Sequence, residues 1–366
     1  MKLAIIGTRG VPAAYGGFET LAEELSVRLA ARGHDVTVYA RAHGVGAVVA
    51  EHRGARVVHL PTLRTKYLDT VVHAALSGIH AAAQGYDAVL VCNGANALLC
   101  RLPRLLGAAT RIALNVDGLE RNRRKWNALG KLVYALSERL SCVMPDVVVT
   151  DARSIEAYYL EAYGQESVYI PYGSDLAPPA GHSTLERLGL HPEGYVLYVS
   201  RFEPENNADA VVRAYRLVAG ETKLVLVGGA PYADELLVRI RAEAGRDPRV
   251  LLPGALYGEP YRELLANAAI YVHATEVGGT HPALLEAMGF GRPLVVHDTP
   301  ENREAAGDAA LYVDARREDS LAAGVTALLA DPRARERSGR AARERARKLY
   351  LWDAVADSYE ALLAGS

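Results

Sequence analysis

Short apolar runs alternate with helical patterns along almost the whole chain. Runs rich in Val, Leu, Ile and Tyr, each bounded by polar or turn residues, are typical of buried strands in a parallel sheet. The strands expected are Lys2–Ile6, Asp35–Ala40, Arg56–Leu60, Asp87–Cys92, Thr110–Asn115, Asp146–Thr150 and Ser167–Pro171, followed by Tyr195–Ser200, Lys223–Val227, Arg249–Leu252, Ala269–Ala274, Pro293–His297 and Ala310–Asp314. Because helical patterns lie between most of them, the chain is expected to be α/β.

Two such series follow one another, separated by the Pro- and Gly-rich segment 171–181. They predict two doubly wound, Rossmann-like domains, an N-terminal one over residues 1–172 and a second over 173–348. The helix expected over 349–366 closes either domain or crosses back onto the first. Ligands of such sheets bind outside the carboxyl ends of the strands, so two facing domains would enclose a ligand cleft.

Composition narrows the class of protein. The 366 residues are 50% hydrophobic and carry a net charge of -2, which indicates a soluble globular protein and argues against nucleic acid as a partner. The three widely spaced cysteines, Cys92, Cys100 and Cys142, are typical of reduced core thiols. With no signal-peptide pattern and no apolar run of the ~18 residues that span a membrane, we expect a cytoplasmic protein.

The stretch 275–293 is the strongest candidate site. It follows an expected strand and leads into an apolar helix beginning near Pro282, so Gly278, Gly279 and Thr280 lie on the turn before a helix N-terminus. Free backbone N–H groups and the helix dipole favour an anion there, most simply a phosphate. Glu286, about one turn inside the helix, would accept hydrogen bonds from two neighbouring hydroxyls. Phosphate and hydroxyls together indicate a nucleotide sugar.

Two further segments follow expected strands. Gly16 and Gly17 open the first helix and suit an anion, although a glycine-rich turn needed only for its backbone angles is equally compatible. Arg201, at the end of a strand, would clamp a diphosphate through two parallel hydrogen bonds, or is simply a surface arginine. No D-x-D motif occurs, so the carboxylate pair that commonly holds a divalent metal on a nucleotide sugar is missing.

An NAD-dependent oxidoreductase is the first alternative to a nucleotide-sugar protein. Gly7 and Gly10 follow the first strand, but they do not form G-x-G-x-x-G, and the second strand ends in Tyr39-Ala40-Arg41 without the acidic residue that a ribose requires. The dinucleotide interpretation is therefore weak.

Several motifs together resemble the GT-B glycosyltransferases of family 4. They are G-G-F-E at the first helix, A-R-G-H-D-V-T-V at its end, P-Y-G-S-D at the linker, and P-A-L-L-E-A-M-G-F-G-R-P. V-D-G-L-E-R-N-R-R-K-W, R-F-E-P-E-N-N and V-G-G-T-H-P-A-L-L-E resemble a rhamnosyltransferase-like branch of that family. The resemblance covers nearly the whole chain and implies the GT-B architecture, with a nucleotide-sugar cleft between its two domains.

By this resemblance the chain transfers a sugar with retention from a nucleoside-diphosphate donor, without a cofactor or an obligatory metal. Glu286 matches the second glutamate of the Glu-x7-Glu motif, which holds the donor ribose, Arg201 matches the arginine on the diphosphate, and Gly17 matches the glycine near the phosphates and acceptor. Two positions depart from the pattern. Gly278 stands where the family has its first glutamate, and Asn206 stands where it has a lysine.

Asp117 lies about where the family has a histidine, after the strand ending at Asn115. It is the candidate for contact with the reacting sugar or the acceptor hydroxyl, and an Asp-Gly turn is an equally good interpretation. The departing phosphate oxygen would take the acceptor proton, so stabilisation of the leaving diphosphate by Arg201 is the main catalytic effect expected.

Four cations, Arg121, Arg123, Arg124 and Lys125, precede an expected helix with an apolar face. Such a run is usually a solvated helix start. Since cations at a helix N-terminus oppose the dipole, docking on anionic lipid headgroups or on a lipid-diphosphate acceptor at the inner face of the cell membrane is the functional alternative.

The sequence thus predicts a glycosyltransferase of polysaccharide biosynthesis that moves a hexose or deoxyhexose, such as rhamnose, to a glycan or lipid-linked acceptor. A catalytically silent sugar-nucleotide-binding protein is the second alternative, because Gly278 and Asn206 replace charged groups. The substrate-binding residues expected are Gly16, Gly17, Arg201, Asn206, Gly278, Gly279, Thr280, His281 and Glu286, and the catalytic ones are Asp117 and Arg201.

Overall fold

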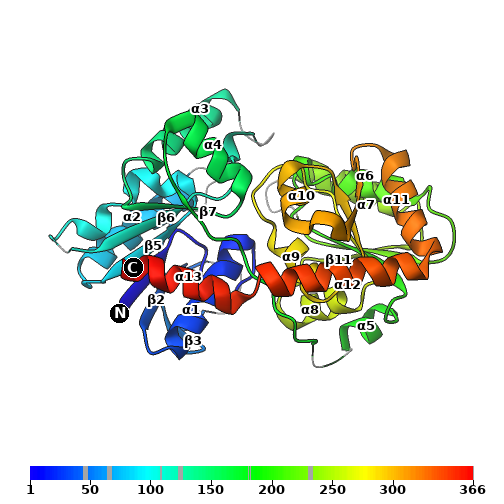
Figure 1. The fold of residues 1–366 in the computed structure, drawn as a ribbon, viewed down its shortest axis with the longest axis horizontal. Helices are drawn as coiled ribbons and strands as arrows, with labels where there is room; N and C mark the ends of the chain where they lie inside the picture. Colours follow the sequence, from blue (N-terminus) through cyan, green and yellow to red (C-terminus); the bar gives the residue numbers. More distant parts are fainter. Residues whose placement is uncertain are drawn as a thin grey trace. The chain divides into compact units, whose positions relative to one another are not determined.

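The structure is a computed structural model that describes residues 1–43, 48–63, 68–107, 109–122, 127–179, 181, 183–229 and 234–365. It divides into two compact units (Figure 1). Unit 1 combines Met1–Tyr172 with Trp352–Ser366, and unit 2 is Gly173–Leu351. The last helix of the chain therefore belongs to unit 1.

Unit 1 is built on an eight-stranded sheet of order β3-β4-β2-β1-β5-β6-β7-β8. Its elements are β1 Lys2–Ile6, α1 Gly17–Ala31, β2 Asp35–Arg41, β3 Glu51–His52, β4 Ala55–Leu60, α2 Leu68–Ala82, β5 Ala88–Cys92, the 3-10 helices η1 Gly94–Leu99 and η2 Leu102–Arg104, β6 Arg111–Asn115, η3 Glu120–Asn122, α3 Ala128–Ser141, β7 Val147–Thr150, α4 Arg153–Tyr163, β8 Val168–Tyr169 and α13 Trp352–Ala364. All neighbouring strands are parallel except β3 and β4.

Both faces of this sheet are covered, which is why its strands are apolar throughout. Ala4 and Ile6 of β1 point into a buried cluster that includes Ala81 of α2 and Ala97 of η1. Helices α1 and α13 pack together and against strands of the same sheet. The strand order reverses between β1 and β5, so the segments that follow these two strands meet at one edge of the sheet.

The C-terminal helix α13 is held in unit 1 by polar contacts. Arg32 of the loop after α1 pairs with Asp357 at 2.7 Å and with Glu360 at 2.6 Å. In the interior, Asn115 Nδ2 donates a hydrogen bond of 2.8 Å to the hydroxyl of the fully buried Tyr359. Exposed ion pairs contribute little to stability, so the buried residues of α13, Tyr359 among them, hold the helix in unit 1.

Unit 2 is built on a six-stranded, fully parallel sheet of order β11-β10-β9-β12-β13-β14. Its elements are α5 Ser183–Leu188, β9 Tyr195–Val199, η4 Pro204–Asn206, α6 Ala208–Tyr215, β10 Lys223–Val227, α7 Asp234–Ala244, β11 Val250–Gly254, α8 Gly258–Asn267, β12 Ile270–His273, α9 Pro282–Gly289, β13 Leu294–His297, α10 Pro300–Ala306, η5 Gly307–Ala309, β14 Ala310–Val313, α11 Glu318–Ala330 and α12 Pro332–Leu349.

The helices of unit 2 lie on both faces of its sheet (Figure 1). Helix α6 packs against α7 and α11, whereas α9 packs against α8 and α12. The strand order reverses between β9 and β12. The crevice outside the carboxyl ends of these two strands is the place where such a domain binds its ligand.

The predicted α/β architecture is confirmed for both units, and each predicted strand is present within two residues of its expected bounds. The strand β3, Glu51–His52, was not predicted. It pairs antiparallel with β4 through a turn in which Arg53 and Gly54 have positive φ angles, 49° and 91°. A two-residue edge strand is too short to have an apolar pattern that predicts it.

Candidate active site

Two loops meet at the strand reversal of unit 2, one after β9 and one after β12. Arg201 lies on the first loop and is partly exposed, and its Nη1 is 3.5 Å from Glu203 Oε1. Three side chains hold the backbone of this loop. Asn206 Nδ2 and Ser200 Oγ both donate to the carbonyl oxygen of Arg201, at 2.7 and 2.6 Å. The Tyr198 hydroxyl donates to the carbonyl oxygen of Asn206 at 2.6 Å. Asn206, where the family has a lysine, thus shapes the loop that presents Arg201.

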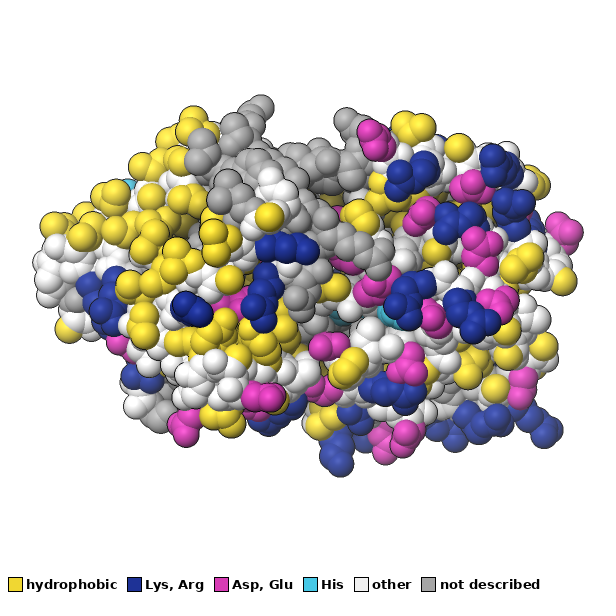
Figure 2. All heavy atoms as spheres, turned by 90° about the horizontal axis from the view of Figure 1, so that it is seen from above, with side chains coloured by type: hydrophobic (Ala, Val, Ile, Leu, Met, Phe, Trp, Pro, Cys, Tyr) yellow, Lys and Arg dark blue, Asp and Glu magenta, His cyan; other side chains and the backbone are white. Residues whose placement is uncertain are grey.

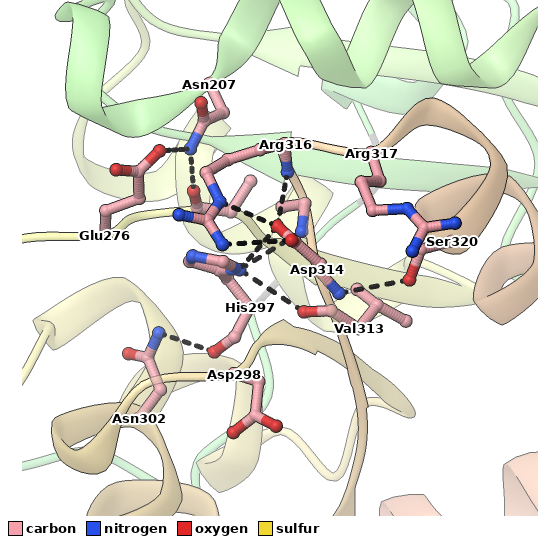
Figure 3. A network of polar contacts seen from close by, with 12 residues as sticks. Asn207, Glu276, His297, Asp298, Asn302, Val313, Asp314, Arg316, Arg317 and Ser320 are labelled. Carbon is pink, nitrogen blue, oxygen red and sulfur yellow. Dashed lines mark hydrogen bonds and ion pairs between the residues drawn. The ribbon is translucent and has the colours of Figure 1, made fainter.

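A second set of contacts joins this loop to the one after β12 (Figure 3). Asn207, which has a left-handed φ of 56°, donates from Nδ2 to Ala274 O at 2.9 Å and to Glu276 Oε1 at 2.8 Å. The N–H of Glu276 in turn donates to Glu205 O at 2.9 Å. These hydrogen bonds connect the two loops directly.

The glycine turn before α9 leaves no room for a side chain at position 278. Gly278 has φ of 155°, and a Cβ added there would lie 2.4 Å from Cε1 and 2.8 Å from Nε2 of His281. Gly279 and Thr280 are buried. The His281 imidazole therefore takes the space beside Gly278, where a family glutamate would begin.

Helix α9 begins at Pro282, as predicted, with His281 as its N-cap residue. The side chain of His281 makes no capping hydrogen bond, and no acidic residue lies in the first turn of the helix. The N–H of Leu284 already donates to the His281 carbonyl oxygen at 3.0 Å, so the positive end of the helix dipole is what favours an external anion here.

Glu286 is half-buried on α9, and its Oε2 accepts a hydrogen bond from the Tyr261 hydroxyl of α8. Burial, with the nearby Glu286 charge, raises the pKa of Tyr261, so that the phenol keeps its proton. Tyr261 therefore orients the carboxylate that the sequence singled out. Sequence reasoning missed Tyr261, because it lies on a separate helix and no spacing links it to Glu286.

Three histidines lie in this part of unit 2, of which only His281 was predicted. The His273 and His281 rings are 4.8 Å apart between centroids. Burial lowers the pKa of His273 to about 3, with the His297 charge as a second cause, so His273 is neutral near pH 7. His273 Nε2 is buried without a hydrogen-bond partner among the described residues. The His273 imidazole therefore places a polar but uncharged group near the glycine turn.

The neighbouring strand ends are cross-braced by a polar network (Figure 3). Arg316 donates to both carboxylate oxygens of Asp314, at 2.8 and 2.9 Å, and these bonds lower the pKa of Asp314 to about 2. Asn302 Nδ2 donates to Thr275 O at 3.1 Å and to His297 O at 2.9 Å. These contacts fix the loops from the β13 and β14 side.

In unit 1, Gly16 is the N-cap residue of α1 and Gly17 is its first residue, as predicted. The first turn of α1, however, already contains a carboxylate. Glu19 is 5% exposed, its Oε1 accepts a 2.8 Å hydrogen bond from the N–H of Arg9, and burial raises its pKa. The turn predicted to meet an external anion thus has an acidic group of the protein beside it.

Asp117 has a φ of 60°, and its N–H donates to Asn115 Oδ1 at 3.0 Å. This is the geometry of the Asp-Gly turn, and the catalytic role of Asp117 stays a prediction. Arg121 Nε is 3.4 Å from Glu138 Oε1, and its Nη2 donates to the Tyr158 hydroxyl. The other three predicted membrane cations, Arg123, Arg124 and Lys125, lie outside the described residues.

Both halves of the chain match known domain families. Residues 193–331 match the family described as "Glycosyl transferases group 1", and residues 16–173 match the family described as "Glycosyl transferase 4-like domain". The chain is a glycosyltransferase. These matches argue against the oxidoreductase alternative. The loops of Arg201 and Glu286 lie in the group 1 domain, and the loops of Gly16 and Asp117 lie in the 4-like domain.

Two relatives of this glycosyltransferase have described activities. The GDP-mannose-dependent alpha-(1-6)-phosphatidylinositol monomannoside mannosyltransferase of Mycolicibacterium smegmatis is 28% identical over 388 aligned residues, which cover 99% of this chain and 98% of that protein. O-antigen chain mannosyltransferase B of Escherichia coli is 29% identical over 174 residues. That match spans 46% of this chain and 45%, less than half, of the E. coli protein. Both are mannosyltransferases, and neither is named as a rhamnosyltransferase.

Solved structures show that this glycosyltransferase has the GT-B fold. Sucrose-phosphate synthase from Thermosynechococcus elongatus superposes with a TM-score of 0.82 at 20% identity, with 100% of both chains covered. Anabaena HepE in complex with UDP and glucose superposes with a TM-score of 0.81 at 15% identity, again over 100% of both chains. The fold predicted from the motifs is therefore confirmed.

Proposed function

We propose that this glycosyltransferase moves a hexose or deoxyhexose from a nucleoside-diphosphate sugar to a glycan or lipid-linked acceptor of a surface polysaccharide or related glycoconjugate. The observation that carries the proposal is the Glu286 carboxylate, oriented by Tyr261 beside the N-terminus of α9. A carboxylate accepts bonds from the two ribose hydroxyls, and a helix N-terminus attracts the diphosphate. These are neighbouring groups of a sugar nucleotide.

The proposed reaction retains the anomeric configuration. The bond between the anomeric carbon and the diphosphate oxygen breaks, the bond to the acceptor oxygen forms on the same face, and the acceptor proton passes to the departing phosphate oxygen. Arg201 and the N-terminal end of α9 stabilise the charge of the leaving diphosphate, which replaces an obligatory metal or other cofactor. Asp117 of unit 1 is assigned a secondary role at the reacting sugar or the acceptor hydroxyl.

The donor sugar is inferred from the glycine turn and from the relatives. With Gly278 in place of a glutamate, the sugar meets the His281 ring and backbone groups in place of a carboxylate. A site with fewer charged acceptors suits a sugar with fewer hydroxyls. Two relatives transfer mannose by name, and rhamnose is a 6-deoxy analogue of mannose. These observations favour a manno-configured donor, either mannose or rhamnose.

The acceptor is proposed to be lipid-linked. One relative acts on a phosphatidylinositol mannoside by name, and the name of another, from Campylobacter jejuni, includes a diphospho-undecaprenol acceptor. No helix among the described residues is long and apolar enough to cross a membrane. The enzyme would then reach its acceptor from the cytoplasmic side, and the basic segment Arg121, Arg123, Arg124 and Lys125 would contact anionic headgroups.

Calorimetric titration with UDP, GDP and dTDP sugars, followed by a product assay on lipid-linked acceptors, tests the proposal. We expect one donor to bind best and to be consumed, with a product of retained configuration and an unchanged rate in the presence of a chelator. The alternative of a silent sugar-nucleotide-binding protein, favoured by Gly278 and Asn206, predicts binding without transfer or donor hydrolysis. Absence of binding by every sugar nucleotide would contradict both.

A further inference from the structure

Helix α3 of unit 1 exposes three large apolar side chains to solvent and buries three polar ones. Leu132, Val133 and Leu136 are 67%, 55% and 57% exposed, whereas Ser137, Glu138 and Ser141 are buried. A helix of a water-soluble domain normally has the opposite orientation, with its apolar stripe on the core. The exposed leucines therefore require a partner that the described structure does not provide.

Neighbouring elements extend this apolar side into a continuous surface. Helix α3 packs against η1, and both η1 and η2 pack against α2. The contact between α2 and η2 is close, because a Cβ added to Gly78 would lie 2.6 Å from the Cβ of Leu102. The further exposed large hydrophobic residues of these elements and of the turns that follow them are Val71, Leu76, Ile79, Leu98, Leu105, Leu106 and Val143.

We call these exposed residues of α2, η1, η2 and α3, with the turns after η2 and α3, the apolar face. Figure 2 shows hydrophobic side chains gathered over the unit 1 part of the surface. Ordinary monomers rarely expose contiguous apolar patches of more than a few hundred Å². A surface of this kind, spread over four elements, marks an interaction site.

The charges on these four elements have one sign wherever they are exposed. Lys131 and Arg139 of α3 are exposed, and so is Arg101 at the start of η2. The carboxylates of the same elements, Asp69 of α2 and Glu138 of α3, are buried. Arg101 also donates to Val143 O at 2.8 Å and to Met144 O at 2.6 Å, so the cation is held beside the loop after α3.

We propose that the apolar face docks on an anionic lipid bilayer, with its leucines in the interface and its cations on the headgroups. Apolar side chains flanked by Lys and Arg are the pattern of a surface that lies in a membrane interface. An exposed carboxylate does occur in the turn after α3, at Asp146, but it is paired with Arg104 of η2. A second copy of this chain is a poorer partner, because it would present the same cations. The face is inferred from unit 1 alone, and its purpose, access to a lipid-linked acceptor, rests on the proposed function.

Vesicle flotation tests the proposal with the full-length protein. The vesicles contain either phosphatidylcholine alone or phosphatidylcholine and phosphatidylglycerol in equal parts. Wild type should float with the phosphatidylglycerol vesicles and much less with phosphatidylcholine alone. The double variant Leu132→Gln/Leu136→Gln should bind about tenfold more weakly, because two leucines no longer enter the interface. The matched control, Leu217→Gln/Val238→Gln, changes exposed apolar residues of unit 2 and should bind like wild type.

Other readouts separate the outcomes. The Leu132/Leu136 variant should keep the melting temperature and the calorimetric affinity for a sugar nucleotide, because exposed side chains contribute little to stability. Wild-type vesicle binding by this variant, or no binding by wild type, would overturn the docking proposal. Concentration-dependent dimers in light scattering that the variant abolishes would reassign the face to self-association. Failure of the proposed function would appear separately, as absence of sugar-nucleotide binding by wild type.

Discussion

The glycine turns before α1 and α9 both lie beside a strand reversal but differ in charge. Each follows a strand next to a reversal of strand order, β1 in unit 1 and β12 in unit 2, and each leads into a helix. The first turn of α1 contains the buried carboxylate of Glu19, whereas that of α9 contains no acidic residue. The turn in unit 1 is thus partly neutralised by the protein, while the turn in unit 2 suits an external anion. This difference supports the proposal that the donor diphosphate binds in unit 2.

The largest effect is expected from Arg201→Ala, which removes the cation from the unit 2 site. We expect kcat/KM for glycosyl transfer to fall about 10²–10³-fold, the scale of losing one group that stabilises developing charge. The melting temperature should change little, because Arg201 is partly exposed and an ion pair such as its 3.5 Å contact with Glu203 contributes little to stability at a surface. The control is Arg216→Ala, an exposed arginine of the same unit paired with Glu243. A kcat/KM within twofold of wild type would remove Arg201 from the site.

Glu286→Ala is expected to weaken nucleotide binding by about 1–3 kcal/mol, since a charged acceptor is lost. Tyr261→Phe should cost less, because the carboxylate remains and only its orientation loosens. Glu259→Ala, on the exposed side of α8, should bind like wild type in the same calorimetric titration. Wild-type affinity in Glu286→Ala would refute the ribose assignment, and equal losses in the first two variants would mean that orientation matters as much as charge.

Gly278→Ala tests the packing of the glycine turn. Its Cβ would lie 2.4 Å from the His281 ring, so we expect the free energy of unfolding to fall by about 1–3 kcal/mol in urea titrations. The double variant Gly278→Ala/His281→Ala should recover part of the loss, because the clashing ring is gone while the unusual φ remains. An unchanged unfolding midpoint in the single variant would show that the turn has another conformation in solution.

The smallest effect concerns Glu19 in unit 1 and depends on pH. Burial raises the folded pKa of Glu19 above its ordinary 4.5, so its stabilising contribution is fully present below 4.5 and is lost as the pH rises through the folded pKa. Relative to wild type, Glu19→Gln should therefore become more stable between pH 4.5 and neutrality. Urea midpoints across this range measure the trend, with the exposed Glu51→Gln as control. Parallel curves for Glu19→Gln and wild type would mean that the carboxylate is solvated.

Apolar patterns were sufficient to place the strands of both sheets other than β3, because a strand buried on both faces must be apolar throughout. The same patterns did not show which way α3 faces. The periodicity of Leu132, Val133 and Leu136 indicates a helix with one apolar side, and only packing decides whether that side meets the core or the solvent. The two-residue β3 had no local signal at all.

The sequence by itself determined that this chain forms two α/β domains, that glycine turns precede α1 and α9, and that Glu286 and Arg201 follow strands. These are local properties, set by residue type and by spacing over a few positions. The tertiary structure alone decided that Tyr261 holds Glu286, that His281 fills the space beside Gly278, and that α13 belongs to unit 1. These contacts join residues on separate elements, and their geometry depends on how the elements pack, which no short-range pattern encodes.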